Sequence, residues 1–465
     1  MMDILEAALA TGGTAVGGNP RFEGVSTDTR TLASGELFIA LRGENFDGHE
    51  FLDVAAERGA AAVMVNAEWA DGHALALPAL QVADTRLALG ALGASWRARF
   101  DIPLIGVTGS NGKTTVKEMI ASILRAQAQA DGYDAELAVL ATTGNLNNDI
   151  GLPLMLLRLH ASHRAAVIEM GMNHPGEIAY LTRLAQPTVA LVNNAQRAHL
   201  VGLGGVAGVA RAKGEIFDGL REGGTAVINA DDPFAGLWRE MNVGRRTLTF
   251  GLEQPADVRG RAELKALGSV LSIDVPPGTV EATLAVPGVH NARNALAAAA
   301  AALATGASPA AVSAGLTSFR GVKGRLQIRP ATGGAVLIDD SYNANPDSVR
   351  AAIDVLAATP GRKILVLGDM GEIGGQAGQF HDEVGGYAKS QGVDQLFALG
   401  EHSELAARNF GAGGRHFGSV EALLEALSPQ LGGDTVVLVK GSRFMRMERV
   451  ADAVADDGKS GNGVH

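Results

Sequence analysis

The sequence predicts an α/β protein of three domains, in which short parallel strands alternate with helices. The chain has 465 residues, which corresponds to roughly three domains of ordinary size. It contains 61 glycines but only 5% aromatic residues, as expected for many tight turns. Short apolar runs bounded by turn residues recur along the chain, and helix-compatible segments follow most of them.

These runs divide the chain into three units and a tail. Residues 1–97 form a small α/β module with predicted strands at Leu37–Leu41, Ala60–Val65 and Ala79–Val82. Residues 98–320 form a central unit with a mostly parallel sheet and an alanine-rich helix around 291–304; its predicted strands are Ile102–Val107, Ala165–Glu169, Val189–Asn193 and Thr225–Ile228. Residues 321–455 form a doubly wound, Rossmann-like unit with strands at Ala335–Asp339, Lys363–Leu367, Gln395–Leu399 and Thr435–Val439. The tail, 456–465, is polar and glycine-rich, and we expect it to be disordered.

Composition and charge exclude several classes of protein. The formal net charge of −11 at pH 7 argues against a nucleic-acid partner, because phosphate backbones attract basic proteins. The chain has no cysteine, so it has neither a disulfide framework nor a thiol nucleophile. No apolar run reaches the ~18 residues of a membrane helix, and the segment MMDILEAALA is acidic where a signal peptide is basic. We therefore expect a cytoplasmic protein without a membrane span.

The most informative segment is the glycine loop, Gly106–Thr115, with the sequence GVTGSNGKTT. It follows the predicted strand Ile102–Val107 and leads into the helix-compatible run Val116–Leu124, which is the order found in phosphate-binding loops. In such loops the lysine, here Lys113, reaches the β and γ phosphates, and the following hydroxyl, here Thr114, holds Mg²⁺. The spacing differs from G-x-x-x-x-G-K-[ST], since the first glycine lies one position too early. The segment predicts a variant loop for a nucleoside triphosphate, with an ordinary turn as the alternative.

Polar residues near strand ends are candidates for metal and substrate binding. Glu169 ends a predicted strand and could bind Mg²⁺, although an acid can also simply cap a strand end. The segment Thr142–Asp149, TTGNLNND, offers amide donors and acceptors to a peptide or sugar, but a solvated loop is its default interpretation. His199 follows another strand and Lys213 lies in a helix-compatible segment. From residue chemistry alone, both are more often structural or solvated.

Two segments of the third unit follow strands. The run Leu337–Val349, LIDDSYNANPDSV, ends a strand in two acids and passes through a polar turn into a helix that Asp347 or Ser348 could cap. Its asparagines lie at the carboxyl end of the strand, where doubly wound sheets bind ligands. The run Ile364–Gly375, ILVLGDMGEIGG, looks like a second nucleotide loop, but its acids would repel phosphates. We interpret it as a structural or domain-facing loop.

Together these segments resemble the Mur ligases, ATP-dependent enzymes that form amide bonds in peptidoglycan precursor synthesis. The matching segments run in family order from about residue 106 to 443: GVTGSNGKTTVKEM, TTGNLNNDIGLP, AVIEMGMNHPGEI, ARAKGEIF, PGVHNARNALAA, DDSYNANPDS, VLGDMGEIG and VVLVKGSR. A glycine loop alone is weak support. The joint occurrence of GMN, DDSYNANPDS and LGDMGE resembles the members that add D-alanyl-D-alanine. The form TGSNGKT is also the one that this family uses, which accounts for the unusual spacing.

The resemblance implies roles for individual residues. It implies that ATP is held by Gly109, Ser110, Asn111, Gly112, Lys113, Thr114, Thr115, Asn291, Asn294, Arg325 and Asp340. It implies two Mg²⁺ ions held by Thr114, Glu169, His199 and Lys213, with Lys213 carbamylated so that a cation becomes a carboxylate-like ligand. The catalytic set that it implies is Lys113, Glu169, His199 and Lys213. The substrate contacts that we expect are Ser26, Asp28, Arg30, Thr142, Thr143, Asn145, Asn147, Tyr342, Asn343 and Asn345.

The activity implied by the resemblance joins D-alanyl-D-alanine to UDP-N-acetylmuramoyl-tripeptide through an acyl phosphate, in a monomer. One alternative is a ligase similar to folylpolyglutamate synthetase, which shares the loop variant but is not expected to carry a module before the loop. Another alternative, from a different class, is a non-catalytic nucleotide-binding protein, which would bind ATP or GTP without turnover that depends on the dipeptide.

Overall fold

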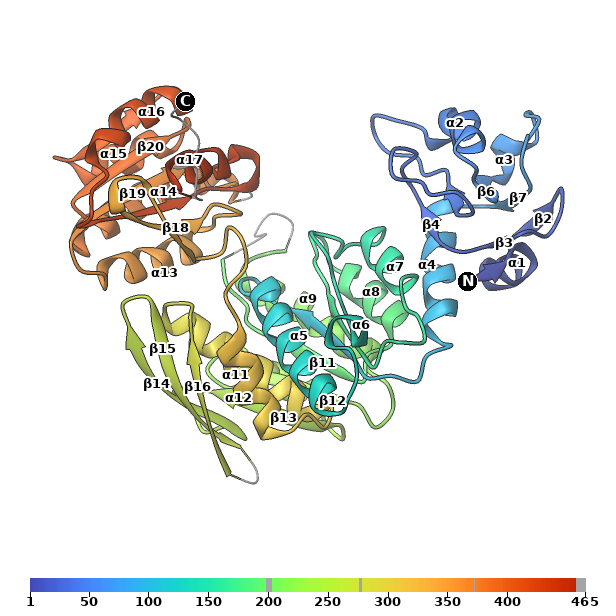
Figure 1. Cartoon of the computed structure of the whole chain (residues 1–465), viewed down its shortest axis with the longest axis horizontal. Helices are drawn as coiled ribbons and strands as arrows, with labels where there is room; N and C mark the ends of the chain where they lie inside the picture. The colour runs from blue at the N-terminus through green and yellow to red at the C-terminus, as the bar shows by residue number, and fades with distance from the viewer. Residues whose placement is uncertain (198–202, 276–277, 372, 457–465) are drawn as a thin grey trace, which may run out of the picture.

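The chain folds into three domains, each built on its own β-sheet (Figure 1). The computed structural model describes residues 1–197, 203–275, 278–371 and 373–456. The first domain, in blue, and the third, in orange to red, lie on either side of the central domain. His199, Glu372 and the predicted tail from residue 457 onward lie outside the described residues.

The first domain has a sheet with the strand order β2-β7-β6-β5-β4. Its strands are β2 (Thr14–Val16), β4 (Val25–Ser26), β5 (Leu37–Ile39), β6 (Ala62–Asn66) and β7 (Ala79–Val82), while β1 (Met2–Asp3) pairs with β3 (Arg21–Phe22). Strands β4 to β7 are parallel and β2 is antiparallel. The helices are α1 (Ile4–Thr11), α2 (Leu52–Glu57), α3 (Ala67–Ala70) and α4 (Thr85–Arg97). Helix α4 starts where the Asp84 side chain accepts hydrogen bonds from two backbone N–H groups of its first turn.

The central domain has a sheet with the strand order β16-β15-β14-β13-β12-β11-β8-β10-β9. Its strands are β8 (Leu104–Thr108), β9 (Val139–Ala141), β10 (Ala165–Glu169), β11 (Val189–Val192), β12 (Thr225–Asn229), β13 (Arg246–Gly251), β14 (Val258–Lys265), β15 (Gly268–Val275) and β16 (Gly278–Leu284). The strands from β9 to β14 are parallel, which confirms the prediction of a mostly parallel sheet. Strands β14 to β16 extend the sheet in antiparallel fashion, and the apolar runs did not predict them.

Helices cover both faces of this sheet. On one face lie α5 (Lys113–Ala130), α11 (Val289–Ala304) and α12 (Pro309–Ser318), and on the other lie α7 (Gly151–Leu156), α8 (Glu177–Ala185), α9 (Val206–Gly214) and α10 (Ala235–Glu240). The short α6 (Ala135–Ala138) precedes β9. The alanines of α11 are buried between the sheet and its neighbours, as expected for close helix packing.

The third domain is doubly wound, as predicted. Its sheet has the order β17-β18-β22-β19-β20-β21, with strands β17 (Gln327–Pro330), β18 (Val336–Asp340), β19 (Arg362–Gly368), β20 (Gln395–Leu399), β21 (Gly414–Phe417) and β22 (Thr435–Lys440). Strand β17 is antiparallel to β18, and the other pairs are parallel. Helices α13 (Pro346–Ala357), α14 (Ala377–Ser390) and α15 (Ser403–Phe410) pack on one face, and α16 (Val420–Leu427) and α17 (Glu448–Val454) pack on the other.

The start of α13 differs from the sequence prediction. The capping residue is Asn345, whose side chain accepts from the backbone N–H of Ser348 while the Ser348 hydroxyl lies within hydrogen-bonding reach of the Asn345 backbone. The expected caps, Asp347 and Ser348, both lie inside the helix, because Pro346 takes its first position. Asp347 is therefore free to point out of the first turn toward the central domain.

The first and central domains are joined by an apolar contact. Helix α4 packs against α7 and α8, and Leu157, which follows α7, is buried in one cluster with Leu89 and Leu92 of α4. The indole N–H of Trp96 donates to the carbonyl of Leu159 over 2.9 Å. Figure 1 shows α4 beside α7 and α8. This junction excludes water in the manner of a domain core.

None of the helices in the described part of the chain is long and apolar enough to cross a membrane.

Candidate active site

A cavity of about 950 Å³ lies between the central and third domains. From the central domain it is lined by Ser110–Thr115 of the glycine loop, by residues 193–197 after β11, and by Asn291 and Asn294 at the start of α11. From the third domain it is lined by Arg325, Asp340 and the turn 342–345. The predicted nucleotide residues and the third-domain substrate residues therefore meet, at the carboxyl ends of parallel strands in both sheets.

The glycine loop has the geometry of a phosphate site. Gly112 adopts a φ of +81°, and a Cβ there would lie 2.5 Å from Asn294 Oδ1 and 2.7 Å from Asn193 Nδ2, so that only glycine fits. Helix α5 begins at Lys113, directly after this glycine, and its first backbone N–H groups have no partner within the helix. The Lys113 Nζ donates to the carbonyl of Gly109 over 2.7 Å. The loop thus combines a helix N-terminus with a cation, which suits an anionic ligand.

Amide side chains hold this loop in place. The Asn194 side chain accepts from the backbone N–H of Asn111 over 2.9 Å, and its carbonyl accepts from that of Ser110 over 3.0 Å. Asn193 Nδ2 donates to the Asn111 carbonyl and to Asn294 Oδ1, both over 3.0 Å. Sequence reasoning missed this role of residues 193–197. The signal was the polar run NNAQR, which follows the apolar strand β11 without a break.

Glu169 is buried beside the glycine loop. Strands β8 and β10 are adjacent and parallel, which brings the Glu169 carboxylate within 2.8 Å of the Thr114 hydroxyl, from which it accepts a hydrogen bond. Its other oxygen accepts from Asn147 Nδ2, also over 2.8 Å, and its backbone N–H donates to the Thr142 hydroxyl. Four of the predicted residues are therefore brought together: Thr114, Thr142, Asn147 and Glu169. Their oxygen atoms are of the kind that Mg²⁺ prefers.

Lys213 is buried in α9. Its side chain is 1% exposed, and this burial, with the Lys113 charge as a second cause, lowers the pKa of its amine well below the ordinary value. Burial therefore favours the uncharged form of this amine more than water does. Among residues 1–197, 203–275, 278–371 and 373–456, no group of three or more His, Asp or Glu side chains is arranged to hold a metal ion.

The third-domain wall of the cavity carries charge and an aromatic ring. Lys440 Nζ binds Asp340 Oδ2 at 2.5 Å and donates to the Asn343 carbonyl over 2.9 Å. Burial raises the pKa of the Asp340 carboxyl, and the Lys440 charge opposes that rise. The Arg325 guanidinium lies 4.4 Å from the centre of the Tyr342 ring. These groups offer an ion pair and a flat face to a ligand in the cavity.

The remaining predicted substrate residues lie away from the cavity lining. Thr143 and Asn145 are exposed on the loop after β9. In the first domain, Asp28 forms an exposed ion pair with Arg30 at 2.6 Å, and the hydrogen bonds from Arg30 lower the pKa of Asp28 to about 2. The Ser26 hydroxyl donates to the Asp28 carbonyl and completes a local turn. The structure shows a shaped turn there, and the roles of these residues stay predictions.

Three family models match the chain in succession. The model described as Mur ligase family, catalytic domain matches residues 21–97; Mur ligase middle domain matches 107–302; and Mur ligase, glutamate ligase domain matches 324–443. The chain belongs to the Mur ligase family. The matches confirm the family and the three-domain α/β fold that the sequence predicts. The match before the glycine loop also disfavours the alternative similar to folylpolyglutamate synthetase.

Relatives of this Mur ligase match it along nearly its whole length. The UDP-N-acetylmuramoyl-tripeptide–D-alanyl-D-alanine ligase of Escherichia coli strain K12 is 42% identical over 462 residues, which are 98% of each chain. The crystal structure of MurF from Acinetobacter baumannii has a TM-score of 0.87 at 35% identity, covering 97% of this chain and 98% of that one. MurF ligase from Thermotoga maritima, in complex with ADP, has a TM-score of 0.79 at 26% identity, covering 92% and 96%.

Proposed function

We propose that this Mur ligase joins D-alanyl-D-alanine to UDP-N-acetylmuramoyl-tripeptide at the expense of ATP, giving the pentapeptide precursor of peptidoglycan, ADP and phosphate. Similarity over 98% of the chain to a ligase named for these substrates supports the proposal. The observation that carries it is the cavity between two domains, which has the glycine loop on one wall and the DDSYNANPDS turn on the other. The ADP complex of a similar structure supports ATP as the nucleotide.

The reaction needs activation because a carboxylate does not react with an amine at neutral pH. Transfer of the γ-phosphoryl group of ATP to the terminal carboxylate of the tripeptide gives an acyl phosphate and ADP. The dipeptide amine then attacks the acyl carbon through a tetrahedral oxyanion, and phosphate leaves as the amide forms. The protein mainly positions the reactants and stabilises their charge. No nucleophilic side chain is required, in agreement with a chain that has no cysteine.

The residues of the cavity divide this work. Lys113 and the backbone N–H groups at the start of α5 neutralise the phosphates. Asn291 and Asn294, both buried and hydrogen-bonded to each other, and Arg325 and Asp340 hold the nucleoside. Tyr342, Asn343 and Asn345 receive the dipeptide on the third-domain side. Glu169, His199 and Lys213 complete the catalytic set.

Two Mg²⁺ ions would be held near the phosphates. The Thr114 hydroxyl and Glu169 carboxylate suit one ion as hard oxygen donors. Lys213 suits a second ion once carbamylated: burial lowers the pKa of its amine, an uncharged amine can add CO₂ and release a proton to give a carbamate, and an ammonium would repel the cation. With His199 it would form the second site. When bound, the ions neutralise charge that develops on the transferred phosphoryl group.

The first domain, residues 1–97, would bind the uridine diphosphate through Ser26, Asp28 and Arg30. The central domain, 98–320, would bind ATP, and the loop that carries Thr142, Thr143, Asn145 and Asn147 would face the peptide. The third domain, 321–455, would contact the dipeptide. We propose that the protein acts as a monomer in the cytoplasm, where ATP and a UDP-linked precursor occur.

The test is phosphate release by the purified full chain. We expect release with ATP, Mg²⁺, UDP-N-acetylmuramoyl-tripeptide and D-alanyl-D-alanine together, and little release when either substrate is omitted. Release that ignores the dipeptide would reject the ligase and favour a nucleotide-binding protein without ligation.

A further inference from the structure

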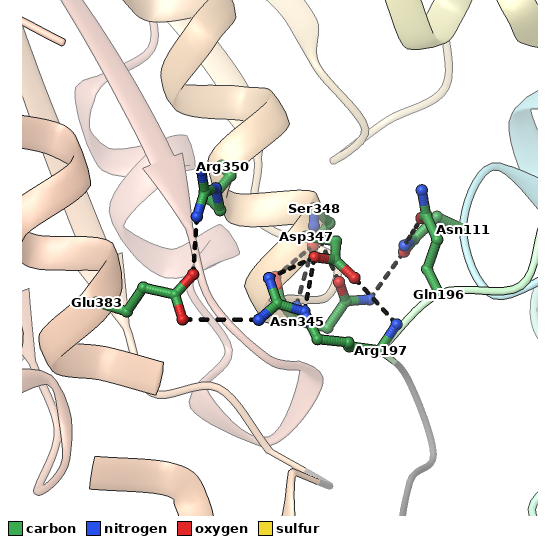
Figure 2. Close-up of polar contacts among 8 residues, drawn as sticks. All are labelled: Asn111, Gln196, Arg197, Asn345, Asp347, Ser348, Arg350 and Glu383. Atoms are coloured by element: carbon green, nitrogen blue, oxygen red, sulfur yellow. Dashed lines mark hydrogen bonds and ion pairs between the residues drawn. The ribbon is translucent and has the colours of Figure 1, made fainter. Parts of the chain in front are cut away.

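Arg197 is a central-domain residue whose side chain lies against the third domain (Figure 2). Its backbone N–H and its Nε each donate to the Asp347 carboxylate over 2.9 Å, and its Nη2 donates over 2.6 Å. The guanidinium also lies 3.6 Å from the Glu383 carboxylate and 5.4 Å from the centre of the Phe380 ring. One residue of the central domain thus reaches two helices of the third domain, α13 and α14. We call this group of four residues the clasp.

The clasp is geometrically strong for a contact between domains. Arg197 and Asp347 are about three-quarters buried, at 29% and 23% side-chain exposure. Arg350 Nη1 donates to Glu383 over 2.8 Å and orients that carboxylate toward Arg197. The bond to Asp347 raises the pKa of Arg197, so the cation is retained. A single half-exposed ion pair contributes little to stability. Several donors on one carboxylate, in contrast, fix both the distance and the angle between the arginine and the carboxylate.

The segment that carries Arg197 also forms hydrogen bonds with the glycine loop. Gln196, the preceding residue, accepts from Asn111 Nδ2 through its side chain over 2.6 Å, and its backbone N–H donates to the Ser110 hydroxyl over 2.9 Å. Asn194 binds the same loop through its backbone and its side chain. Arg197 therefore extends from the segment that braces the phosphate loop.

A second path links the same helix to the same loop. Asn345, the cap of α13, donates from Nδ2 to Asn111 Oδ1 over 2.8 Å. Asn345 and Asp347 lie at the N-terminus of one helix, so the loop and the Arg197 segment hold that helix at two points (Figure 2). Two points of attachment restrict rotation of the third domain as well as its separation from the central one.

We propose that Arg197 is a positioning residue: it clasps α13 against the glycine loop, so that the dipeptide side of the cavity is presented in register with the phosphates. The reaction to which this positioning applies rests on the proposed function. The contact itself does not, since it is made entirely by side chains and backbone of this chain. The clasp lowers the free-energy cost of bringing the two domains together. Without the clasp, this cost would weaken substrate binding.

The structural arm of the test measures the distance between the domains without ligand. The natural chain has no cysteine, so Glu222→Cys in the central domain and Glu425→Cys in the third domain, both exposed, give one labelling pair for single-molecule energy transfer. We expect Arg197→Gln to broaden the distance distribution and shift it away from that of the parent. Arg197→Lys, which keeps the charge but loses the fork, should fall between the two. An unchanged distribution in Arg197→Gln would overturn the proposal.

The kinetic arm measures ligation by the unlabelled full chain. We expect Arg197→Gln to raise the KM for D-alanyl-D-alanine about fivefold, with kcat changed less than about twofold. Asp347→Asn should act alike, and the double variant should be no worse than either single one, because both remove the same contact.

Controls separate the clasp from general damage and from failure of the proposed function. Arg261→Gln removes an exposed arginine that pairs with Asp274 over 3.3 Å within the β14–β15 hairpin, and it should change neither distance nor KM. A shifted distance with an unchanged KM would overturn the positioning role. If the parent shows no dipeptide-dependent phosphate release, the proposed function fails, while the distance comparison still decides whether the clasp holds the domains.

Discussion

The two junctions of this molecule are built from different chemistry. The first and central domains meet through apolar side chains, with Leu157 buried against α4. The central and third domains meet across a cavity of about 950 Å³, and the contacts that bridge it are ion pairs and amide hydrogen bonds, such as Arg197–Asp347 and Asn345–Asn111. Opening an apolar contact exposes hydrocarbon to water, whereas polar groups exchange one partner for a water molecule at small cost. The comparison indicates one joint fixed by buried hydrocarbon and one held by polar contacts, which water can replace.

The largest effect on ligation should come from the polar junction, because the glycine loop lines the cavity there. We expect Lys113→Ala to lower ligation about a thousandfold or more, because a cation at the phosphates is lost in the transition state. The circular dichroism spectrum and both junctions should be unchanged. Lys265→Ala, on an exposed hairpin strand, is the matched control and should retain full activity. A folded Lys113→Ala variant that still ligates would contradict the assignment of the glycine loop.

The next largest effect should come from Lys213, which is buried in α9 of the central domain. Lys213→Ala should lose most activity, with partial recovery on addition of acetate or propionate, since a small acid can occupy the space and supply the missing carboxylate. Lys213→Met fills the same volume with an apolar chain, so it should be inactive without recovery. Phosphate release in the presence and absence of the acid measures both. Normal ligation by Lys213→Ala would show that no carbamate is needed.

A smaller effect, on stability alone, should come from the apolar junction. Leu157→Ala removes a 6%-exposed side chain from the shared cluster, and we expect a loss of about 2–4 kcal/mol. Urea unfolding followed by tryptophan fluorescence measures it, since Trp69 and Trp96 lie in the first domain. Leu264→Ala, at 51% exposure, should change little. If Leu157→Ala unfolds like the parent, or if Arg197→Gln costs as much, the contrast between the junctions is wrong.

Strand positions were predictable wherever a buried strand reads as an apolar run. Strands β7, β10 and β20 have the predicted bounds, and the other predicted strands shift by a residue or two. Strands β14 to β16 were missed because they are covered on one face, so that apolar and polar residues alternate, as in Gly268–Val275. In the segment Ile364–Gly375, Asp369 is buried and accepts from the backbone N–H groups of His402 and Ser403, as in a structural loop, whereas Gly371 and Ile373 line the cavity.

The proximity of some candidate site residues was predictable where family motifs carry them. Thr114, Asn147 and Glu169 meet in the structure, although Thr142–Asp149 read as a solvated loop from its residues alone. The contacts of Arg197 were not predictable, since its partner lies 150 positions away, and the motif DDSYNANPDS, which contains Asp347, does not indicate that this carboxylate binds the central domain. From the sequence alone, the arginine of the run NNAQR would be predicted to be solvated. Only the folded arrangement of the two domains shows that it contacts the third domain.

The glycine loop is held in place by asparagine side chains. Asn193 and Asn194 bond its backbone, and Asn111 and Asn345 bond each other across the cavity. Amide side chains neither gain nor lose a proton in water near neutral pH. The loop should therefore keep one shape on either side of neutrality, and acid or alkali would alter the reacting groups before it altered the site. A pH profile of ligation would then report on the chemistry of Lys213 and the substrates.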